Sequence, residues 1–92
     1  MSKVFVGIDV SKKELSITMI IGGKYEYYVV ANNKEGFDNF AGLLASRNID
    51  KVNACMESTG IYGFAFADYL HDLKHEVSIV SRRVIIPGSL FL

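Results

Sequence analysis

The stretch VFVGIDVSK, residues 4–12, decides the fold. Its first seven residues are apolar at nearly every position, a pattern typical of a central strand covered on both faces, and only Asp9 interrupts the run. A second carboxylate, Glu57, closes another apolar run in CMESTG, residues 55–60. The kind of site that this chain can build depends on whether the fold brings these two acids together.

A hairpin is predicted directly after the first strand. Residues Glu14 to Ile21 and Lys24 to Val30 are rich in alternating, β-branched and aromatic side chains, which predicts two further strands. The pair Gly22-Gly23 between them favours a tight turn, because both of its central positions can adopt positive φ. Strands one to three are therefore expected to form an antiparallel unit.

Two helices alternate with two more strands in the second half. Asn32, with Glu35 three residues later, predicts the cap of a helix that ends near Arg47 and Asn48. A second helix is predicted to end at Lys74-His75. Its apolar stripe at helical spacing consists of Tyr62, Phe66, Tyr69, Leu70 and Leu73.

The remaining strands are predicted at Val52–Met56 and Glu76–Val80. The element order is thus β-β-β-α-β-α-β. Right-handed crossovers place Val52–Met56 beside the first strand and parallel to it.

This topology brings Asp9 and Glu57 to one edge of the sheet. Neighbouring strands lie about 4.8 Å apart, so two carboxylates at matched heights can share one cation, and Mg²⁺ suits such an all-oxygen site. Two other readings stay open at this point. Asp9 with Ser11 also fits a turn that ends a strand, and Glu57 with residues 58–60 also fits a polar lead into a helix cap.

Composition limits the remaining possibilities. The 92 residues have zero formal net charge, which predicts one small domain, residues 1–92, with no overall attraction to nucleic acid. A phosphate-facing edge can be built only from Lys12, Lys13, Arg82 and Arg83, which are otherwise ordinary solvated charges.

The single cysteine and the N-terminus indicate the compartment. Cys55 lies in a predicted strand and is expected to be a small buried hydrophobe. The chain has no signal-peptide pattern and no apolar run long enough to span a membrane, so a reducing, cytoplasmic setting is expected.

Two motifs together resemble a known family. The segments VGIDVSKKELSITMI (6–20) and CMESTGIYGFAFADYL (55–70), followed by VSIV (77–80), are similar to the N-terminal RuvC-like domain of DEDD-type insertion-sequence transposases. That family also includes the Piv pilin-gene invertases and the bridge-RNA-guided recombinases. The resemblance spans about residues 4–80, and it is specific because both motifs occur at the family's separation; either motif alone is weak.

The resemblance implies an α/β, RNase H-like fold with a mixed five-stranded sheet. It assigns Asp9 and Glu57 as catalytic residues that hold Mg²⁺ or Mn²⁺ during DNA strand cleavage and exchange. DNA is the implied partner of the full-length protein, and whether a guide RNA is also bound stays open.

The family's other acidic residues have no counterpart in this chain. They lie on a helix with a D-x-x-D pattern, whereas the divergent apolar tail SRRVIIPGSLFL, residues 81–92, has no acidic residue, and the family's nucleophilic Ser belongs to a separate domain. We therefore expect a truncated catalytic domain that binds metal weakly and is inactive alone. Self-association through the apolar tail or a sheet edge is also expected.

Three alternatives remain. Sugar kinases and actin-like ATPases open with a similar three-stranded unit, although their phosphate-binding turn is usually rich in Gly and Thr, and here it reads Ser11-Lys12-Lys13. A non-catalytic interaction module would keep the fold without a metal. His71 and His75, four residues apart, match half of a helical zinc site but lack an evident third ligand.

Overall fold

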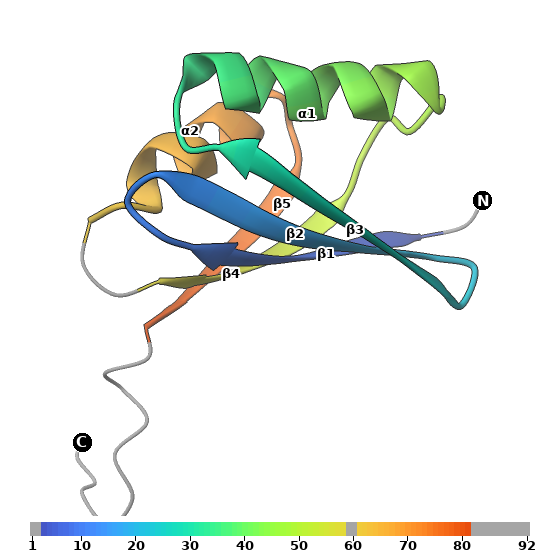
Figure 1. The fold of residues 1–92 in the computed structure, drawn as a ribbon. Helices are drawn as coiled ribbons and strands as arrows, with labels where there is room; N and C mark the ends of the chain where they lie inside the picture. Colours follow the sequence, from blue (N-terminus) through green and yellow to red (C-terminus); the bar gives the residue numbers. More distant parts are fainter. Residues whose placement is uncertain (1–2, 59–60, 82–92) are drawn as a thin grey trace, which may run out of the picture.

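The computed structural model describes residues 3–58 and 61–81, which form five strands and two helices. The order agrees with the prediction, and most boundaries fall within two residues of it. Figure 1 shows the elements in place: β1 (Val4–Val10), β2 (Glu14–Ile21), β3 (Lys24–Ala31), α1 (Lys34–Ser46), β4 (Asn53–Ser58), α2 (Phe64–Asp72) and β5 (Glu76–Ser81).

The five strands make one mixed sheet in the order β3-β2-β1-β4-β5. β1 is central, antiparallel to β2 and parallel to β4, and β5 is parallel to β4. The β2–β3 hairpin turns at Gly22 and Gly23, whose φ angles of 56° and 81° are strained for residues with a side chain. The predicted hairpin and the predicted neighbours of β1 are thus confirmed.

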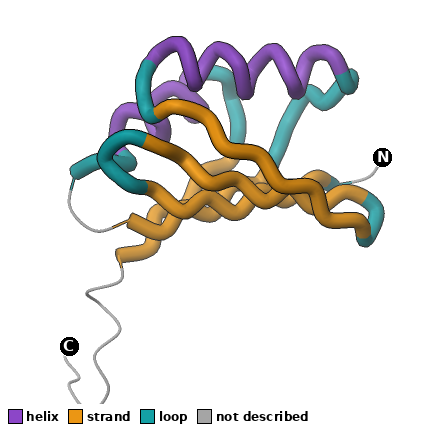
Figure 2. The backbone as a smooth tube through the Cα atoms, viewed as in Figure 1, coloured by secondary structure: helices purple, strands orange, loops and turns teal. Residues whose placement is uncertain are grey.

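Both helices pack on the same face of the sheet, as Figures 1 and 2 show. Side chains alternate across each strand, so every second residue enters the core between the sheet and the helices. This core consists of Val4, Val6, Ile8, Leu15, Ile17, Met19, Phe37, Phe40, Leu44, Val52, Ala54, Met56, Phe66, Ala67 and Leu70.

The opposite face of the sheet is not covered by any described helix, and we call it the open face. Strand register assigns to it Phe5, Gly7, Asp9, Ser16, Thr18, Ile20, Tyr25, Tyr27, Val29, Asn53, Cys55, Glu57, Glu76, Ser78 and Val80.

Side chains on the open face correct two predictions. Phe5 is 48% exposed, so β1 is covered on one face within the described residues rather than on both. Cys55 is exposed as well, because its register partners Gly7 and Ser78 are too small to cover it. An apolar run in the sequence does not distinguish a strand covered on both faces from one with exposed apolar residues.

The start of α1 is held tightly against the end of β3. The cap is Asn33 rather than Asn32: its side chain accepts a hydrogen bond from the Gly36 backbone N–H at 2.9 Å. A Cβ atom on Gly36 would lie 1.8 Å from the carbonyl oxygen of Ala31, so only glycine fits there. This close approach fixes the direction in which the chain enters the helix.

Aromatic contacts join the two helices. The ring of Phe66 stacks on Phe37 at a centroid distance of 4.9 Å and meets the edge of Phe40 at 5.8 Å. The Tyr69 hydroxyl donates a hydrogen bond to Asp38 at 2.7 Å. Tyr62 departs from the prediction: it precedes α2 and is 44% exposed, so it lies outside the buried stripe.

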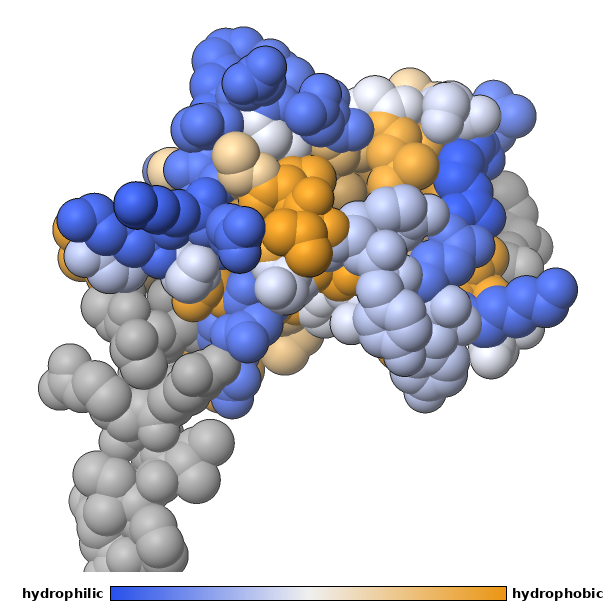
Figure 3. Space-filling model, in the orientation of Figure 1, coloured by the Kyte–Doolittle hydropathy of each residue, from blue (hydrophilic) through white to orange (hydrophobic). Residues whose placement is uncertain are grey.

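The surface is mostly polar over the helix layer. Figure 3 shows apolar surface in a band between the helices and the sheet. None of the helices in the described part of the chain is long and apolar enough to cross a membrane. Residues 82–92, which include Arg82, Arg83 and all of the apolar tail but Ser81, lie outside the described residues.

Candidate active site at the carboxyl ends of two parallel strands

Asp9 and Glu57 are register partners in the parallel pair β1–β4. Partners in a parallel ladder project to the same face, and adjacent strands lie about 4.8 Å apart. Both carboxylates therefore stand next to each other on the open face, near the carboxyl ends of their strands. The predicted convergence of the two acids is confirmed, whereas their catalytic and metal-binding roles remain predictions.

The turn after β1 is closed by Ser11. Its backbone N–H donates to the Glu14 carbonyl at 2.9 Å, and its hydroxyl donates to the same carbonyl at 3.0 Å. The Glu14 N–H in turn donates to the Ser11 hydroxyl oxygen at 3.1 Å. Ser11 thus supplies the short polar side chain that ends the strand, and Asp9 lies two residues earlier on the sheet itself.

The two acids of the site differ in their exposure to solvent. Asp9 is exposed and Glu57 is half-buried. Over residues 3–58 and 61–81, no group of three or more His, Cys, Asp or Glu side chains is placed to hold a metal ion. The described residues therefore offer at most a carboxylate pair, so water and phosphate oxygens would have to complete a Mg²⁺ coordination sphere.

Two basic residues follow the strand that carries Asp9. Lys12 and Lys13 are exposed in the turn that directly follows β1. The two arginines of the predicted phosphate-facing edge, Arg82 and Arg83, fall outside the described residues.

Asn32 has a different role in this region from the one that its sequence predicts. It was expected to cap α1, but its side-chain amide bonds to the carbonyls of Ser11 and Tyr62, each at 2.9 Å. Those carbonyls belong to the segments that follow β1 and β4. The sequence carries no signal for such contacts, because both acceptors are backbone atoms far away in the chain.

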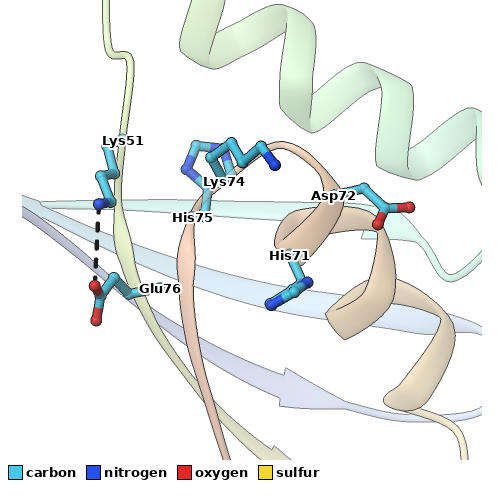
Figure 4. Close-up of a pocket in the computed structure, with 6 residues that line it drawn as sticks. All are labelled: Lys51, His71, Asp72, Lys74, His75 and Glu76. Atoms are coloured by element: carbon cyan, nitrogen blue, oxygen red, sulfur yellow. Dashed lines mark ion pairs between the residues drawn. The ribbon is translucent and has the colours of Figure 1, made fainter.

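The two histidines lie beside a different pocket, of 440 Å³, shown in Figure 4 with Lys51, Asp72, Lys74 and Glu76 around it. α2 ends at Asp72, so His71 and His75 do not share a helical face, and Figure 4 shows their rings pointing in different directions. His75 is buried, and its Nδ1 accepts a hydrogen bond from the Val52 N–H at 3.1 Å. Burial, followed by the charge of Lys51, lowers the pKa of His75. His75 is thus a core residue, and the zinc reading is not supported.

Solved structures share the fold at low sequence identity. A T. thermophilus RuvC, solved with a Holliday junction substrate, aligns with a TM-score of 0.58 and 10% identity over 88% of this chain and 66% of that one. Archaeoglobus fulgidus Pelota aligns with a TM-score of 0.56 and 19% identity over 85% of this chain and 26% of that one.

A phosphatase structure also shares the fold. An exopolyphosphatase from Cytophaga hutchinsonii reaches a TM-score of 0.50 with 13% identity over 86% of this chain and 34% of that one. Likenesses at this level of identity establish the fold, which is RNase H-like with a mixed five-stranded sheet, as predicted.

No family model matches the chain. The pilin gene-inverting proteins of Moraxella lacunata and Moraxella bovis are each 28% identical to it over 83 residues, which cover 88% of this chain. The chain spans about a quarter (26%) of the length of these relatives. The chain is therefore distantly similar to proteins named for inverting a gene, and it has the RNase H-like fold that RuvC also has.

Proposed function

We propose that this chain is the N-terminal catalytic-domain part of a DNA transposase or site-specific recombinase, and that Asp9 and Glu57 belong to its divalent-metal site. The observation that carries the proposal is the register of β1 and β4, which pairs these two acids on the open face. The distant similarity to the pilin gene-inverting proteins and the fold shared with RuvC support DNA recombination as the process.

The donor atoms of the pair fit Mg²⁺ or Mn²⁺. Carboxylate oxygens are hard ligands, and these ions take oxygen donors while keeping several waters or phosphate oxygens. When bound, the metal would polarise phosphate oxygens during strand cleavage. Two carboxylates fill only part of an octahedral sphere, so the affinity of this chain for the ion is weak and the chain is inactive alone.

Thermal unfolding with and without Mn²⁺ tests the metal site. A ligand at ten times its dissociation constant stabilises the folded state by about 1.4 kcal/mol, and a domain of this size then gains roughly 5 to 10 °C in Tm. Asp9→Asn and Glu57→Gln should each abolish this gain. Asp68→Asn removes an exposed carboxylate on α2 and is the matched control that keeps the gain. An equal Mn²⁺ response in all four proteins would refute the site.

Lys12 and Lys13 are proposed to bind DNA phosphates beside the carboxylates. Removing one lysine that neutralises a phosphate should reduce the slope of log affinity against log salt by about 0.9. A Lys12→Ser, Lys13→Ser double variant should therefore lower the slope by nearly two, and a Lys24→Ser, Lys34→Ser double variant should leave it unchanged. Arg82 and Arg83 are proposed as a second pair of phosphate-binding residues. Measuring the affinity for RNA in the same way tests whether the chain also binds a guide RNA.

A second candidate is an actin-like ATPase or sugar-kinase fragment, which the exopolyphosphatase likeness favours. In that case the turn after β1 would bind a nucleotide phosphate, and adenosine triphosphate with Mg²⁺ would shift the backbone amides of residues 11–13. Against this candidate, the turn is closed by Ser11 and carries two lysine side chains in place of small residues. A non-catalytic interaction module instead predicts no response to either Mn²⁺ or nucleotide.

Two copies are proposed to associate through the open face at the β3 edge. Tyr27 and Val29 are 73% and 63% exposed there. Because the net charge of the chain is zero, two copies do not repel each other through net charge. Sedimentation should show a dimer that Val29→Lys converts to a monomer. Ala45→Lys, which adds the same charge at an exposed position of α1, should leave the dimer intact.

A further inference from the structure

Three large apolar side chains are exposed in one short turn, residues 61–64, which leads into α2. Ile61, Tyr62 and Phe64 are 71%, 44% and 54% exposed, whereas Gly63 between them is buried. Single exposed apolar residues are ordinary on a protein surface, but three of them within four consecutive residues form a patch of the kind that marks an interaction site. We call Ile61, Tyr62 and Phe64 the turn patch.

The backbone of this turn is held by hydrogen bonds. The Phe64 N–H donates to the Ile61 carbonyl at 3.2 Å, and the Ala67 N–H donates to the Gly63 carbonyl at 3.0 Å. Tyr62 is held by its backbone carbonyl, which accepts a hydrogen bond from the Asn32 amide. The exposed side chains of the turn patch are thus presented by a fixed backbone.

The turn patch lies beside the turn that carries two lysines. The Asn32 amide donates to the Ser11 carbonyl as well as to the Tyr62 carbonyl, each at 2.9 Å. Because one nitrogen reaches both carbonyls, Ser11 and Tyr62 are neighbours in space although they are far apart in the sequence. The exposed residues Lys12 and Lys13 come directly after Ser11. Figure 1 shows the turn after β1 and the start of α2 on the same side of the molecule.

Aromatic rings beside ammonium groups fit one class of partner. Proteins that bind unpaired nucleic acid strands place cationic side chains on the phosphates and aromatic rings against the faces of the bases. A base inside a duplex is stacked between its neighbours, so it has to leave the stack before it can lie on a ring. An apolar protein surface would also cover the rings, but it would leave the two ammonium groups without a counter-charge.

We propose that the turn patch binds an unpaired segment of DNA, with bases stacked on Tyr62 and Phe64 and with phosphates on Lys12 and Lys13. The choice of DNA as the partner rests on the proposed function. The inference adds the kind of DNA that is bound, an unpaired segment, and the side chains that recognise its bases.

Fluorescence anisotropy with three labelled probes separates stacking from charge. The probes are a single-stranded oligodeoxynucleotide, its duplex, and an abasic strand of the same length that keeps every phosphate but has no bases. The titrations contain no divalent metal, so they do not depend on the metal site. The wild-type chain should bind the single strand at least about fivefold more tightly than the abasic strand, as expected when at least one base is stacked.

Substitutions in the turn patch test the rings directly. Tyr62→Ala and Phe64→Ala should each weaken binding of the single strand by about fivefold to a hundredfold, and should leave binding of the abasic strand and the duplex unchanged. Tyr62→Phe keeps the ring and should keep the affinity. Tyr25→Ala removes a ring that is 60% exposed near the β2–β3 turn, and this matched control should bind all three probes as the wild type does.

The salt dependence of binding distinguishes the rings from the lysines. The variants Tyr62→Ala and Phe64→Ala remove no charge, so they should keep the wild-type slope of log affinity against log salt, whereas the Lys12→Ser, Lys13→Ser double variant lowers it. Urea denaturation checks that each variant is folded at the concentrations used.

Each outcome supports or overturns the inference. Ring variants that bind the single strand as Tyr25→Ala does, or a wild-type chain that binds the abasic strand equally well, would overturn it and leave phosphate binding by the lysines in place. Loss of self-association in Phe64→Ala, with unchanged affinity for the single strand, would assign the turn patch to a protein contact and would also overturn it. No binding of any probe would overturn both the inference and DNA as the partner. Ring-dependent binding by a chain that shows no Mn²⁺ response would support the inference and overturn the proposed metal site instead.

Discussion

His75 makes the stability of the fold depend on pH in the mildly acidic range. Its Nδ1 accepts the N–H of Val52, a residue with 0% exposure, so the imidazole must be neutral on that nitrogen. Burial, and after it the charge of Lys51, lowers the pKa of His75. Protonation would turn the acceptor into a donor and leave the buried Val52 N–H without its partner.

The sign of the effect follows from the direction of this shift. Because the pKa of His75 is lower in the folded chain, the unfolded chain takes up the proton first as the pH falls. The stabilisation is complete above about pH 6.5, the ordinary value for histidine, and is lost as the pH falls towards the folded value. Between pH 6.5 and 5.5 the free energy of unfolding should therefore fall, by no more than about 1 kcal/mol, because one proton changes it by at most about 1.36 kcal/mol per pH unit.

Urea denaturation followed by circular dichroism, repeated across this pH range, measures the drop. His75→Asn keeps an oxygen that can accept the Val52 N–H and does not titrate, so its stability should be lower overall but nearly flat in pH. His71→Asn, which replaces an exposed histidine, should keep the wild-type slope. Two carboxylates with lowered pKa, Glu26 and Asp38, change the stability only at lower pH. The pKa of Glu26 is lowered by its hydrogen bond with Arg47, and that of Asp38 by the hydrogen bond from the Tyr69 hydroxyl. A His75→Asn variant with the wild-type slope would refute the reasoning.

Three further predictions use matched positions. Gly36→Ala should destabilise the fold by about 1 to 3 kcal/mol in urea denaturation, because its Cβ would clash with the Ala31 carbonyl. Gly42→Ala should instead stabilise the fold by about 0.5 to 1 kcal/mol, because the space around its Cβ is open. Phe66→Ala should cost about 3 to 5 kcal/mol, since Phe66 has 0% exposure, and Phe64→Ala, at a position 54% exposed, should cost less than about 1 kcal/mol by the same assay. Cys55 should react with a thiol reagent in the folded chain nearly as fast as in urea; strong protection at low protein concentration would contradict an open face.

The sheet was predictable because its signals are local and periodic. The pair Gly22-Gly23 predicted the β2–β3 hairpin. In β4, apolar residues alternate with Asn53 and Cys55, and this alternation predicted its two faces. Handedness then fixed the neighbours of β1 without any information beyond the order of the elements. The pairing of Asp9 with Glu57 followed from the same rules, since it needs only a period of two and parallel strands.

The errors arose where the outcome depended on neighbours distant in sequence. Cys55 was predicted to be buried, but it is exposed, and its exposure depends on the small size of Gly7 and Ser78 in other strands. Tyr62 fitted a helical stripe, yet α2 begins only at Phe64. Asn32 was predicted to cap α1, but Asn33 is the cap, and the Asn32 amide bonds to the Ser11 and Tyr62 carbonyls instead.

The arrangement separates what stabilises the domain from what the domain is proposed to do. The apolar core lies between the sheet and the two helices, while both carboxylates stand on the opposite, open face. Substitutions at Asp9 or Glu57 therefore leave the core packing intact, and substitutions such as Phe66→Ala act on the other side of the sheet.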